Sequence, residues 1–211
     1  MNEDLPARKE RWARKMAGRD TAVPRSTDRL PPGQHLVTDF PVLDLAIKPE
    51  MPAADWRLQV HGEVAEPKTF TLPELAELPR FTDISDFHCV TTWSQFDMEF
   101  SGVAFFTLAD LVKPRSTARF VIMQSYDGYT TSLPLDAMLD DDVMLATHWN
   151  GEPLSLEHGA PVRVLVPKRY AWKSAKWIRE LRFAAEDQLG YWEKRGYSNS
   201  ADPFTNDRFA R

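Results

Sequence analysis

The sequence predicts an α+β domain that is rich in β-structure, with mixed sheets and a few short helices. Three observations predict this fold class. Short apolar or alternating segments recur along the chain and are separated by Gly, Pro, Asn or Asp residues. Segments with the period of an α-helix are few and short. The chain also lacks an internal repeat, a G-x-G-x-x-G motif and a Walker A motif, so nothing points to a repeat architecture or a dinucleotide-binding fold.

The predicted strands occupy most of the chain after residue 55. Residues 56–61 alternate between apolar and polar side chains, which is typical of a half-buried strand that Gly62 ends. The runs 119–124 and 161–166 are the most apolar and β-branched. Asp127-Gly128 and Asn150-Gly151 are turn signals. The remaining expected strands are 67–70, 81–87, 98–103, 129–133, 143–149 and 177–183.

The predicted helices are short. The clearest begins at Thr71, an N-cap residue with Glu74 three positions later, and should end near Pro79. A second helix is expected over 106–112, beginning at Thr107, and another over 134–139. Residues 6–16 and 191–195 also read as helical, and the tail to Arg211 reads as irregular.

Two regions differ in composition. Residues 1–35 are charged and contain prolines and Gly33, so we expect an extended N-terminal arm, and residues 36–211 form the domain. The arm could be a solvated tail, or it could wrap the domain and close one side of a binding site.

Composition excludes several classes of protein. The net charge of −5 and the pI near 5.6 argue against nucleic acid as a partner. No apolar run approaches the roughly 20 residues that a membrane-spanning helix needs. The first residues lack the apolar core of a secretory signal, so we expect a cytoplasmic location. A single cysteine excludes a disulfide framework.

That cysteine, Cys89, lies in the stretch Phe87-His88-Cys89-Val90-Thr91-Thr92-Trp93-Ser94. A lone cysteine can be a buried packing residue, a nucleophile, or a thiolate ligand of a metal whose other ligands come from elsewhere. A nucleophile would need a base such as His88, but neighbours on a strand point to opposite faces, which disfavours that alternative.

Five segments in order carry a resemblance to a known family. They are 56–62 (WRLQVHG), 88–90 (HCV), 125–129 (SYDGY), 150–154 (NGEPL) and 161–177 (PVRVLVPKRYAWKSAKW). In this order the chain, from about Phe40 to about Pro203, resembles the molybdopterin-binding domain of the sulfite oxidase family in its small bacterial form. The resemblance implies that domain's fold and a molybdenum atom held by pterin dithiolene sulfurs, oxo groups and one cysteine.

The resemblance also implies a set of site residues. Cys89 would be the molybdenum ligand and the catalytic residue. The cofactor-binding residues would be His88, Cys89, Ser125, His158, Arg163, Ser174, Ala175 and Lys176.

Other assignments for some of these residues stay open at this point. Arg163 could face solvent on an edge strand, and His158 could be a turn residue stacked on Pro161. Cys89 could still be a packing residue. Lys173 also lies where a pocket cation could be, while Lys168 and Arg169 should face solvent or the pocket mouth. The aromatic residues that could line a substrate funnel or pack in the core are Trp93, Tyr126, Tyr129, Trp149 and Trp172.

The implied function is a molybdenum cofactor-dependent oxidoreductase that transfers an oxygen atom or two electrons at a Cys89-ligated centre. Its small-molecule substrate, sulfite-like or sulfoxide-like, is not identified. The tyrosine of sulfite-oxidising relatives is missing from Ala146-Thr147-His148-Trp149, so the cofactor site is better supported than sulfite as the substrate. A separate electron-transfer partner and a monomeric state are expected. The alternative is a non-catalytic member of the same fold that binds molybdopterin or a partner protein.

Overall fold

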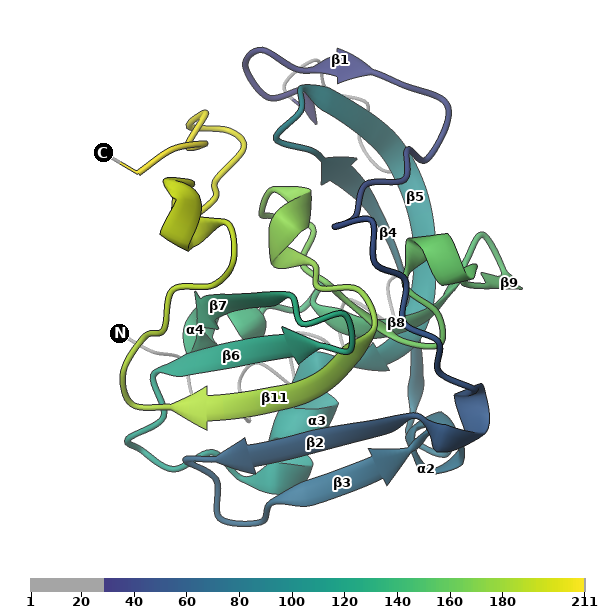
Figure 1. The fold of residues 1–211 in the computed structure, drawn as a ribbon, viewed down its shortest axis with the longest axis vertical. Helices are drawn as coiled ribbons and strands as arrows, with labels where there is room; N and C mark the ends of the chain where they lie inside the picture. The colour runs from purple at the N-terminus through teal and green to yellow at the C-terminus, as the bar shows by residue number, and fades with distance from the viewer. Residues whose placement is uncertain (1–28, 211) are drawn as a thin grey trace.

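The computed structural model describes residues 29–210, and the helix expected over residues 6–16 lies outside them. Two mixed β-sheets and a few short helices make up the described part, as Figure 1 shows. The predicted β-rich α+β fold class is therefore confirmed. None of the helices within residues 29–210 has the length and apolar character needed to cross a membrane.

The five-stranded sheet has the order β3-β2-β11-β6-β7. Strand β2 pairs in parallel with β11, and all other pairs in this sheet are antiparallel. Residues far apart in sequence thus become neighbours at its centre. The strands are β2 (Arg57–Gly62), β3 (Lys68–Thr71), β6 (Phe120–Ser125), β7 (Thr130–Pro134) and β11 (Ile178–Ala184).

The six-stranded sheet is organised around the long strand β5 (Trp93–Ala104). Strand β5 pairs antiparallel with β4 and β8 and in parallel with β1. The other strands are β1 (His35–Leu36), β4 (Arg80–His88), β8 (Met144–Trp149), β9 (Glu152–Pro153) and β10 (Arg163–Leu165). Because β4 ends at His88 and β5 begins at Trp93, the tight turn between them holds Cys89.

Helix α2 (Leu72–Ala76) begins as the sequence predicts. The Thr71 hydroxyl accepts a hydrogen bond from the Glu74 backbone amide, and the Glu74 carboxylate accepts one from the Thr71 backbone, which is a complete capping box. Helix α3 (Phe105–Val112) begins earlier than Thr107, with Ala104 as its N-cap. The remaining helices are α4 (Leu135–Met138) and the 3₁₀ turns η2 (Ala53–Asp55), η3 (Leu156–His158), η4 (Ala171–Lys173) and η5 (Glu193–Arg195).

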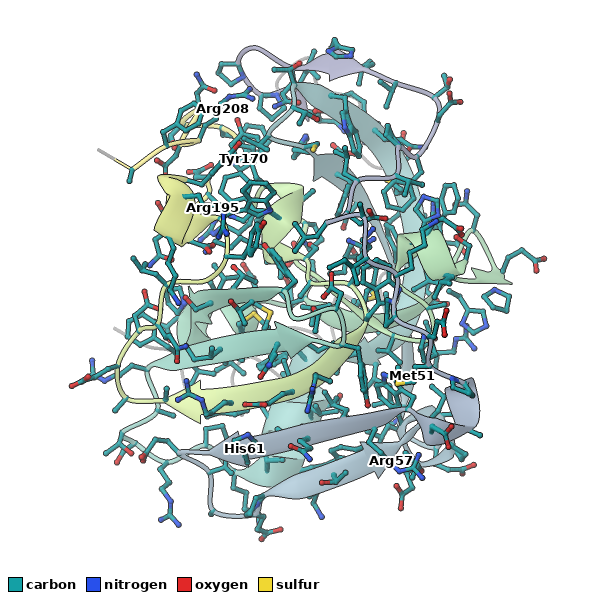
Figure 2. All side chains as sticks on the ribbon, viewed as in Figure 1. Met51, Arg57, His61, Tyr170, Arg195 and Arg208 are labelled. Carbon is teal, nitrogen blue, oxygen red and sulfur yellow. The ribbon has the colours of Figure 1, made fainter. Side chains whose placement is uncertain are left out.

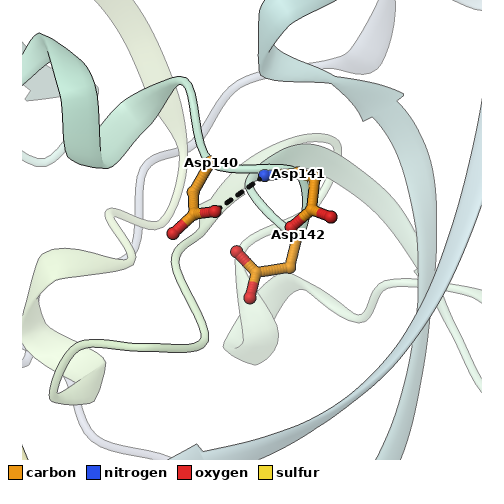
Figure 3. Close-up of side chains that lie close together, drawn as sticks. All are labelled: Asp140, Asp141 and Asp142. Carbon is orange, nitrogen blue, oxygen red and sulfur yellow. Dashed lines mark hydrogen bonds between the residues drawn. The ribbon is translucent and has the colours of Figure 1, made fainter. Parts of the chain in front are cut away.

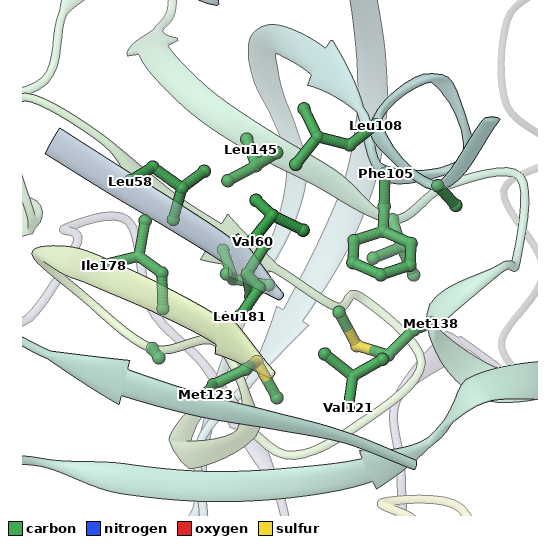
Figure 4. Close-up of a cluster of buried hydrophobic side chains, with 14 of the residues drawn as sticks. Leu58, Val60, Phe105, Leu108, Val121, Met123, Met138, Leu145, Ile178 and Leu181 are labelled. Atoms are coloured by element: carbon green, nitrogen blue, oxygen red, sulfur yellow. The ribbon is translucent and has the colours of Figure 1, made fainter. Parts of the chain in front are cut away.

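The main apolar core lies against the five-stranded sheet and α3 (Figure 4). It gathers inward-facing residues of β2, β6 and β11 around Phe105 and Leu108. A second apolar cluster follows the six-stranded sheet and includes Phe87, Cys89 and Trp93. The thiol therefore lies at the edge of packed aromatic side chains and not on an open loop.

Two strands differ in length from the prediction. The expected strand 98–103 extends from Trp93 to Ala104, since its first residues pair with β4 and β1. The expected strand 161–166 shortens to β10, because the chain around it turns into the loops of the site. Close contact between β5 and β8 requires Gly102, where a Cβ atom would lie 1.9 Å from the Leu145 carbonyl oxygen.

The described part of the N-terminal segment lies along the domain. Arg29 forms ion pairs with Asp86 and Asp97, and β1 pairs with the start of β5. The chain then runs without regular structure from residue 37 to residue 52, down the side of the molecule in Figure 1. This path brings residues 40–45 over the cavity described next.

Candidate functional site

A cavity of about 350 Å³ is lined by residues of both sheets, by residues 40–45 and by Trp192 and Tyr197 of the C-terminal segment. All of the predicted site residues except His88 line it. They are Cys89, Ser125, His158, Arg163, Ser174, Ala175 and Lys176. These residues lie far apart in the sequence, and the fold gathers three of the five segments that carry the resemblance, 88–90, 125–129 and 161–177, into one site.

Cys89 follows the last residue of β4 and opens the turn of residues 89–92, which we call the cysteine turn. The turn is closed by the Thr92 amide, which donates to the Cys89 carbonyl oxygen at 3.1 Å. Thr92 has a left-handed φ of 80°. The Cys89 side chain is 5% exposed, and its Sγ accepts a hydrogen bond from the Thr91 hydroxyl at 3.2 Å. Burial raises the pKa of the thiol, and the hydrogen bond from Thr91 lowers it by a smaller amount.

His88 lies on the other side of the strand from the cavity. Its Nδ1 is 2.8 Å from the Ser94 Oγ, and its ring meets the edge of Phe204. Burial lowers the pKa of His88 to about 4, so the ring is neutral near pH 7. The structure therefore does not bring His88 into the candidate site, and neither does it aim His88 at the thiol as a base.

Arg163, on β10, is a buried cation. It is 4% exposed, which excludes the surface position that the sequence left open. Its guanidinium donates to the carbonyl oxygens of His158 and Ser174, both at 3.0 Å, and lies 5.4 Å from the centre of the Phe87 ring. No carboxylate of the described residues forms an ion pair with it, and burial lowers its pKa to about 10. A buried cation without an acidic partner favours an anionic ligand.

His158 and Lys176 lie beside Arg163. The His158 ring stacks on Phe40 with centroids 4.2 Å apart, and its Nε2 is 3.0 Å from the Phe40 carbonyl oxygen. Lys176 Nζ donates to the Glu157 carbonyl oxygen at 2.8 Å and lies 3.8 Å from Asp44 Oδ2. Burial and the charge of Arg163 lower the pKa of Lys176 to about 8. Lys176 thus adds to the positive character of this part of the cavity, whereas burial lowers the pKa of His158 and disfavours its charged form.

Gly159 lets these groups approach one another. It has a φ of +107°, which favours glycine, and a Cβ atom there would lie 3.0 Å from the Arg163 Cβ and 3.1 Å from the Lys176 Cβ. The glycine therefore makes room for two cationic side chains on either side of the backbone.

Ser174 and Ala175 form the wall that follows η4. The Ser174 hydroxyl accepts a hydrogen bond from the Val166 amide at 2.9 Å, and the Val164 amide donates to the Ala175 carbonyl oxygen at 2.8 Å. These bonds attach the loop to β10. Ser125, at the end of β6, is 1% exposed, and its hydroxyl has no hydrogen-bond partner in the described structure.

Two other clusters of charge lie outside the cavity. Lys173 is fully buried and pairs with Glu193 at 2.5 Å. It therefore does not line the cavity but stabilises the loop of Ser174 and Ala175, which we call the site loop, from outside the cavity. Figure 3 shows Asp140, Asp141 and Asp142 close together. Lys168 forms ion pairs with Asp140 at 2.8 Å and Asp142 at 3.3 Å, so this acidic cluster already has a cationic partner.

Aromatic residues form much of the cavity wall. Trp93, Tyr129 and Trp172 line it, whereas Tyr126 and Trp149 do not. The sequence reasoning missed other residues that line the cavity. These are Leu43, Asp44, Thr91, Trp177, Trp192 and Tyr197. Thr91 and Trp177 lie inside the quoted stretches 87–94 and 161–177, whereas the other four lie in irregular segments that no motif or periodic pattern marks.

The residues present fit a molybdopterin cofactor. A cavity of about 350 Å³ is within the usual range for ligand pockets, about 300–1,000 Å³. The Ser125 hydroxyl is a buried polar group that needs a partner. Arg163 and Lys176 suit a phosphate, and Cys89 is a soft ligand suited to a molybdenum–sulfur centre.

The fold and this donor set together define a cofactor-binding redox domain, and comparison with known proteins gives its family. Residues 45–192 match the family described as "Oxidoreductase molybdopterin binding domain", and the chain belongs to that family. It is thus a molybdopterin-dependent oxidoreductase whose cofactor carries molybdenum. The expected resemblance is confirmed.

Individual relatives cover the chain to different extents. It is 41% identical over 184 residues to the oxidoreductase YuiH of Bacillus subtilis, covering 86% of this chain and 92% of the relative. It is 32% identical to the putative protein-methionine-sulfoxide reductase subunit YedZ1 of Azospira oryzae, over 71% of this chain. The chain covers 56% of that relative. Among solved structures, the sulfane dehydrogenase SoxCD of Paracoccus pantotrophus matches with a TM-score of 0.62 and 26% identity, over 71% of this chain and 42% of that one.

Proposed function

We propose that Cys89 is the protein ligand of molybdenum and that the enzyme reduces a neutral sulfoxide to the sulfide. The observation that carries the proposal is the shared cavity. The one cysteine of the chain lines the same space as a buried cation, Arg163, and a buried hydroxyl, Ser125. Within residues 29–210, Arg163 has no acidic partner and the Ser125 hydroxyl has no hydrogen-bond partner. A thiolate, a positive subsite and a free hydrogen-bond donor are the groups that such a cofactor needs from a protein.

The roles of the cofactor-binding residues follow from their contacts. Arg163 and Lys176 would bind the anionic end of the cofactor, since they lie together beside His158 and Gly159. The Ser125 hydroxyl would donate to the pterin. Ala175 offers only a methyl group, so the ligand can approach the backbone there. The bound cofactor supplies a metal that can exchange two electrons and an oxygen atom with the substrate.

The charge distribution in the cavity supports a neutral substrate. The wall next to Cys89 is formed by Phe87, Val90 and Trp93, which carry no charge. The cations of the cavity, Arg163 and Lys176, lie instead beside η3 and β10, because their side chains donate to backbone carbonyl oxygens of η3. Sulfite is an anion and would need a positive group beside the metal, whereas a sulfoxide would not.

The reaction balances with water as its second product. A sulfoxide, two electrons and two protons give a sulfide and water, so the S–O bond breaks and sulfur is reduced. The electrons would come from a separate redox protein. The names of two relatives support a sulfoxide substrate and a second protein component. These relatives are the putative protein-methionine-sulfoxide reductase subunit of A. oryzae and the protein-methionine-sulfoxide reductase catalytic subunit of Campylobacter jejuni. The monomeric state and the cytoplasmic location stay predictions from the sequence.

A two-direction assay tests the substrate class. Purified protein with bound molybdenum is given methionine sulfoxide with reduced viologen as electron donor, and separately sulfite with ferricyanide as acceptor. We expect viologen oxidation in the first assay and none above background in the second. Oxidation of sulfite without sulfoxide reduction would contradict the substrate proposal.

The variant Cys89→Ser tests the ligand. It should keep its circular dichroism spectrum and lose turnover, because a hydroxyl is a poor replacement for a soft thiolate ligand. Full turnover in this variant would show that Cys89 is a packing residue. Protein without molybdenum, purified from cells that make the cofactor, would contradict the whole proposal.

A further inference from the structure

The cysteine turn accepts hydrogen bonds from segments near both ends of the described chain. The Gln34 side-chain amide donates to the Cys89 carbonyl oxygen at 3.0 Å, and the Arg208 guanidinium donates to the Val90 carbonyl oxygen. The His35 backbone amide donates to the Thr92 carbonyl oxygen at 2.9 Å. Three of the four carbonyl oxygens in the turn are thus held by residues that lie far from it in sequence.

Gln34 joins the two sides of the turn. While its amide nitrogen donates to Cys89, its Oε1 accepts a hydrogen bond from the Ser94 hydroxyl at 3.3 Å. Ser94 is the second residue of β5, and β1 pairs with it directly after Gln34. The side chain therefore ties the start of the turn to the strand that follows it.

Arg208 reaches the turn from the C-terminal segment. Its Nε donates to Asn206 Oδ1 at 2.6 Å, and its guanidinium lies 5.2 Å from the centre of the Tyr170 ring. Arg208 and Tyr170 are labelled close to each other in Figure 2. Tyr170 is fully buried and directly precedes η4, whose loop carries Trp172 and Ser174 into the cavity. Arg208 thus connects the cysteine turn to the opposite wall of the site.

We infer that Gln34 and Arg208 are positioning residues that hold the Cys89 thiol toward the cavity. Neither residue lines the cavity, so neither would touch the cofactor or the substrate. Without them, the turn would lose its side-chain hydrogen bonds from both ends of the described chain. It would keep the backbone bonds from Thr92 to Cys89, from Cys89 to Trp93 and from His35 to Thr92, and the bond from the Thr91 hydroxyl to the thiol. The inference rests on the proposed role of Cys89 as the metal ligand, but the position of the thiol can be tested in protein without the metal.

The single cysteine makes the test direct, because a maleimide can label only one thiol. Cofactor-free wild-type protein is compared with Arg208→Met, Gln34→Leu and Arg208→Lys at one fixed pH. The matched control is Arg195→Met. Arg195 is also in the C-terminal segment, lies 3.6 Å from the centre of the Tyr191 ring and has no bond to the turn.

We expect faster labelling in Arg208→Met by about tenfold, the effect of losing one hydrogen bond from a charged donor. Gln34→Leu should also label faster, Arg208→Lys should lie closer to wild type because its ammonium can still donate, and Arg195→Met should match wild type. A change in thiol pKa cannot imitate this result. The charge of Arg208 lowers the pKa of Cys89, so removing it alone would slow the labelling.

Two results would overturn the inference: wild-type labelling rates in both Arg208→Met and Gln34→Leu, or an equal increase in Arg195→Met. Molybdenum content, measured on the same variants purified with cofactor, separates this inference from the proposed function. If wild-type protein held no molybdenum but the labelling pattern appeared, the proposed function would fail and the positioning of the thiol would stand.

Discussion

Arg163 donates a hydrogen bond to the carbonyl oxygen of Ser174 at 3.0 Å, and this contact joins β10 to the loop after η4. The guanidinium is buried, and among the described residues no carboxylate forms an ion pair with it. The protein therefore keeps a buried positive charge in the cavity and satisfies its N–H groups with backbone carbonyls. Such an arrangement stabilises the loop and leaves the charge available to a ligand.

Arg163→Lys keeps the charge but cannot donate to both His158 and Ser174 in the same planar geometry. We expect molybdenum per chain to fall by about tenfold, the loss of one charged hydrogen bond of roughly 1.5 kcal/mol. Elemental analysis of purified protein measures it. The control Arg179→Lys changes an exposed arginine on β11 and should leave the molybdenum content unchanged; an equal loss in both variants would contradict this role.

Ser125→Ala should have opposite effects on the two forms of the protein. The hydroxyl of Ser125 has no partner in the described structure, so its removal from the cofactor-free protein should raise or preserve the melting temperature. In the loaded protein the same change should lower the melting temperature, because a hydrogen bond to the cofactor is lost. Differential scanning calorimetry of both forms measures this.

Ser132→Ala is the matched control for Ser125→Ala. Ser132 is also buried, but its hydroxyl donates to Asp187 at 2.6 Å. Its removal should destabilise both forms, by about 1–3 kcal/mol if the Asp187 carboxylate loses a needed donor. A uniform loss of stability in Ser125→Ala, like that of the control, would show that the hydroxyl has a structural role only.

The buried pair of Lys173 and Glu193 anchors the site loop to the C-terminal segment. Glu193 also accepts hydrogen bonds from Thr131 at 2.8 Å and from the Trp172 indole at 3.2 Å. Glu193→Gln leaves an uncompensated ammonium in the interior, and we expect a loss of about 3–5 kcal/mol in the free energy of unfolding. Denaturant titration measures it.

Two further variants separate charge from packing at this pair. Lys173→Met combined with Glu193→Gln removes both charges and should recover part of the loss. Lys168→Ala breaks an ion pair at the surface and should cost about 1 kcal/mol or less. If Glu193→Gln cost no more than Lys168→Ala, the buried pair would not anchor the loop.

The binding of anions should depend on pH through Lys176. Burial lowers the pKa of this lysine to about 8 from the usual 10.5, so it is charged below that pH and neutral above it. The affinity of cofactor-free protein for sulfate, whose charge is constant, should therefore fall as the pH rises through about 8. Isothermal titration at several pH values measures this.

The control variants for anion binding are Lys176→Met and Lys48→Met. The first should bind sulfate weakly and with little dependence on pH. The second changes an exposed lysine that pairs with Glu157. Its charge is the smallest of the effects on the pKa of Lys176, so the pH dependence should stay close to that of the wild type. Unchanged pH dependence in Lys176→Met would show that another group controls anion binding.

Local patterns in the sequence predict most of the elements but not their long-range pairing. The capping box at Thr71 and the turn at Asp127-Gly128 depend on neighbouring residues, and both form as expected. The extension of β5 back to Trp93 depends instead on partners in β1 and β4. Residues 93–97 lack a strong alternation of their own, so no local signal marks them as strand.

The candidate site also combines features that local sequence patterns predict with features that depend on long-range contacts. Three of the five segments that resemble the family, 88–90, 125–129 and 161–177, line one cavity, although the sequence alone left Arg163 between a surface and a buried position. His88 lies outside the cavity, because successive residues at the end of β4 face opposite sides. Gln34 and Arg208 could not be predicted, since their contacts are with backbone carbonyls and any donor of the right length could make them.

Molybdenum X-ray absorption spectroscopy tests the assignment of Cys89 most directly. The measurement compares the number of sulfur neighbours of molybdenum in the wild-type protein and in Cys89→Ser, each purified with its cofactor. The account predicts one fewer sulfur neighbour in the variant, because the pterin sulfurs remain and the thiolate is gone. The same number of sulfur neighbours in both proteins would show that Cys89 does not bind the metal.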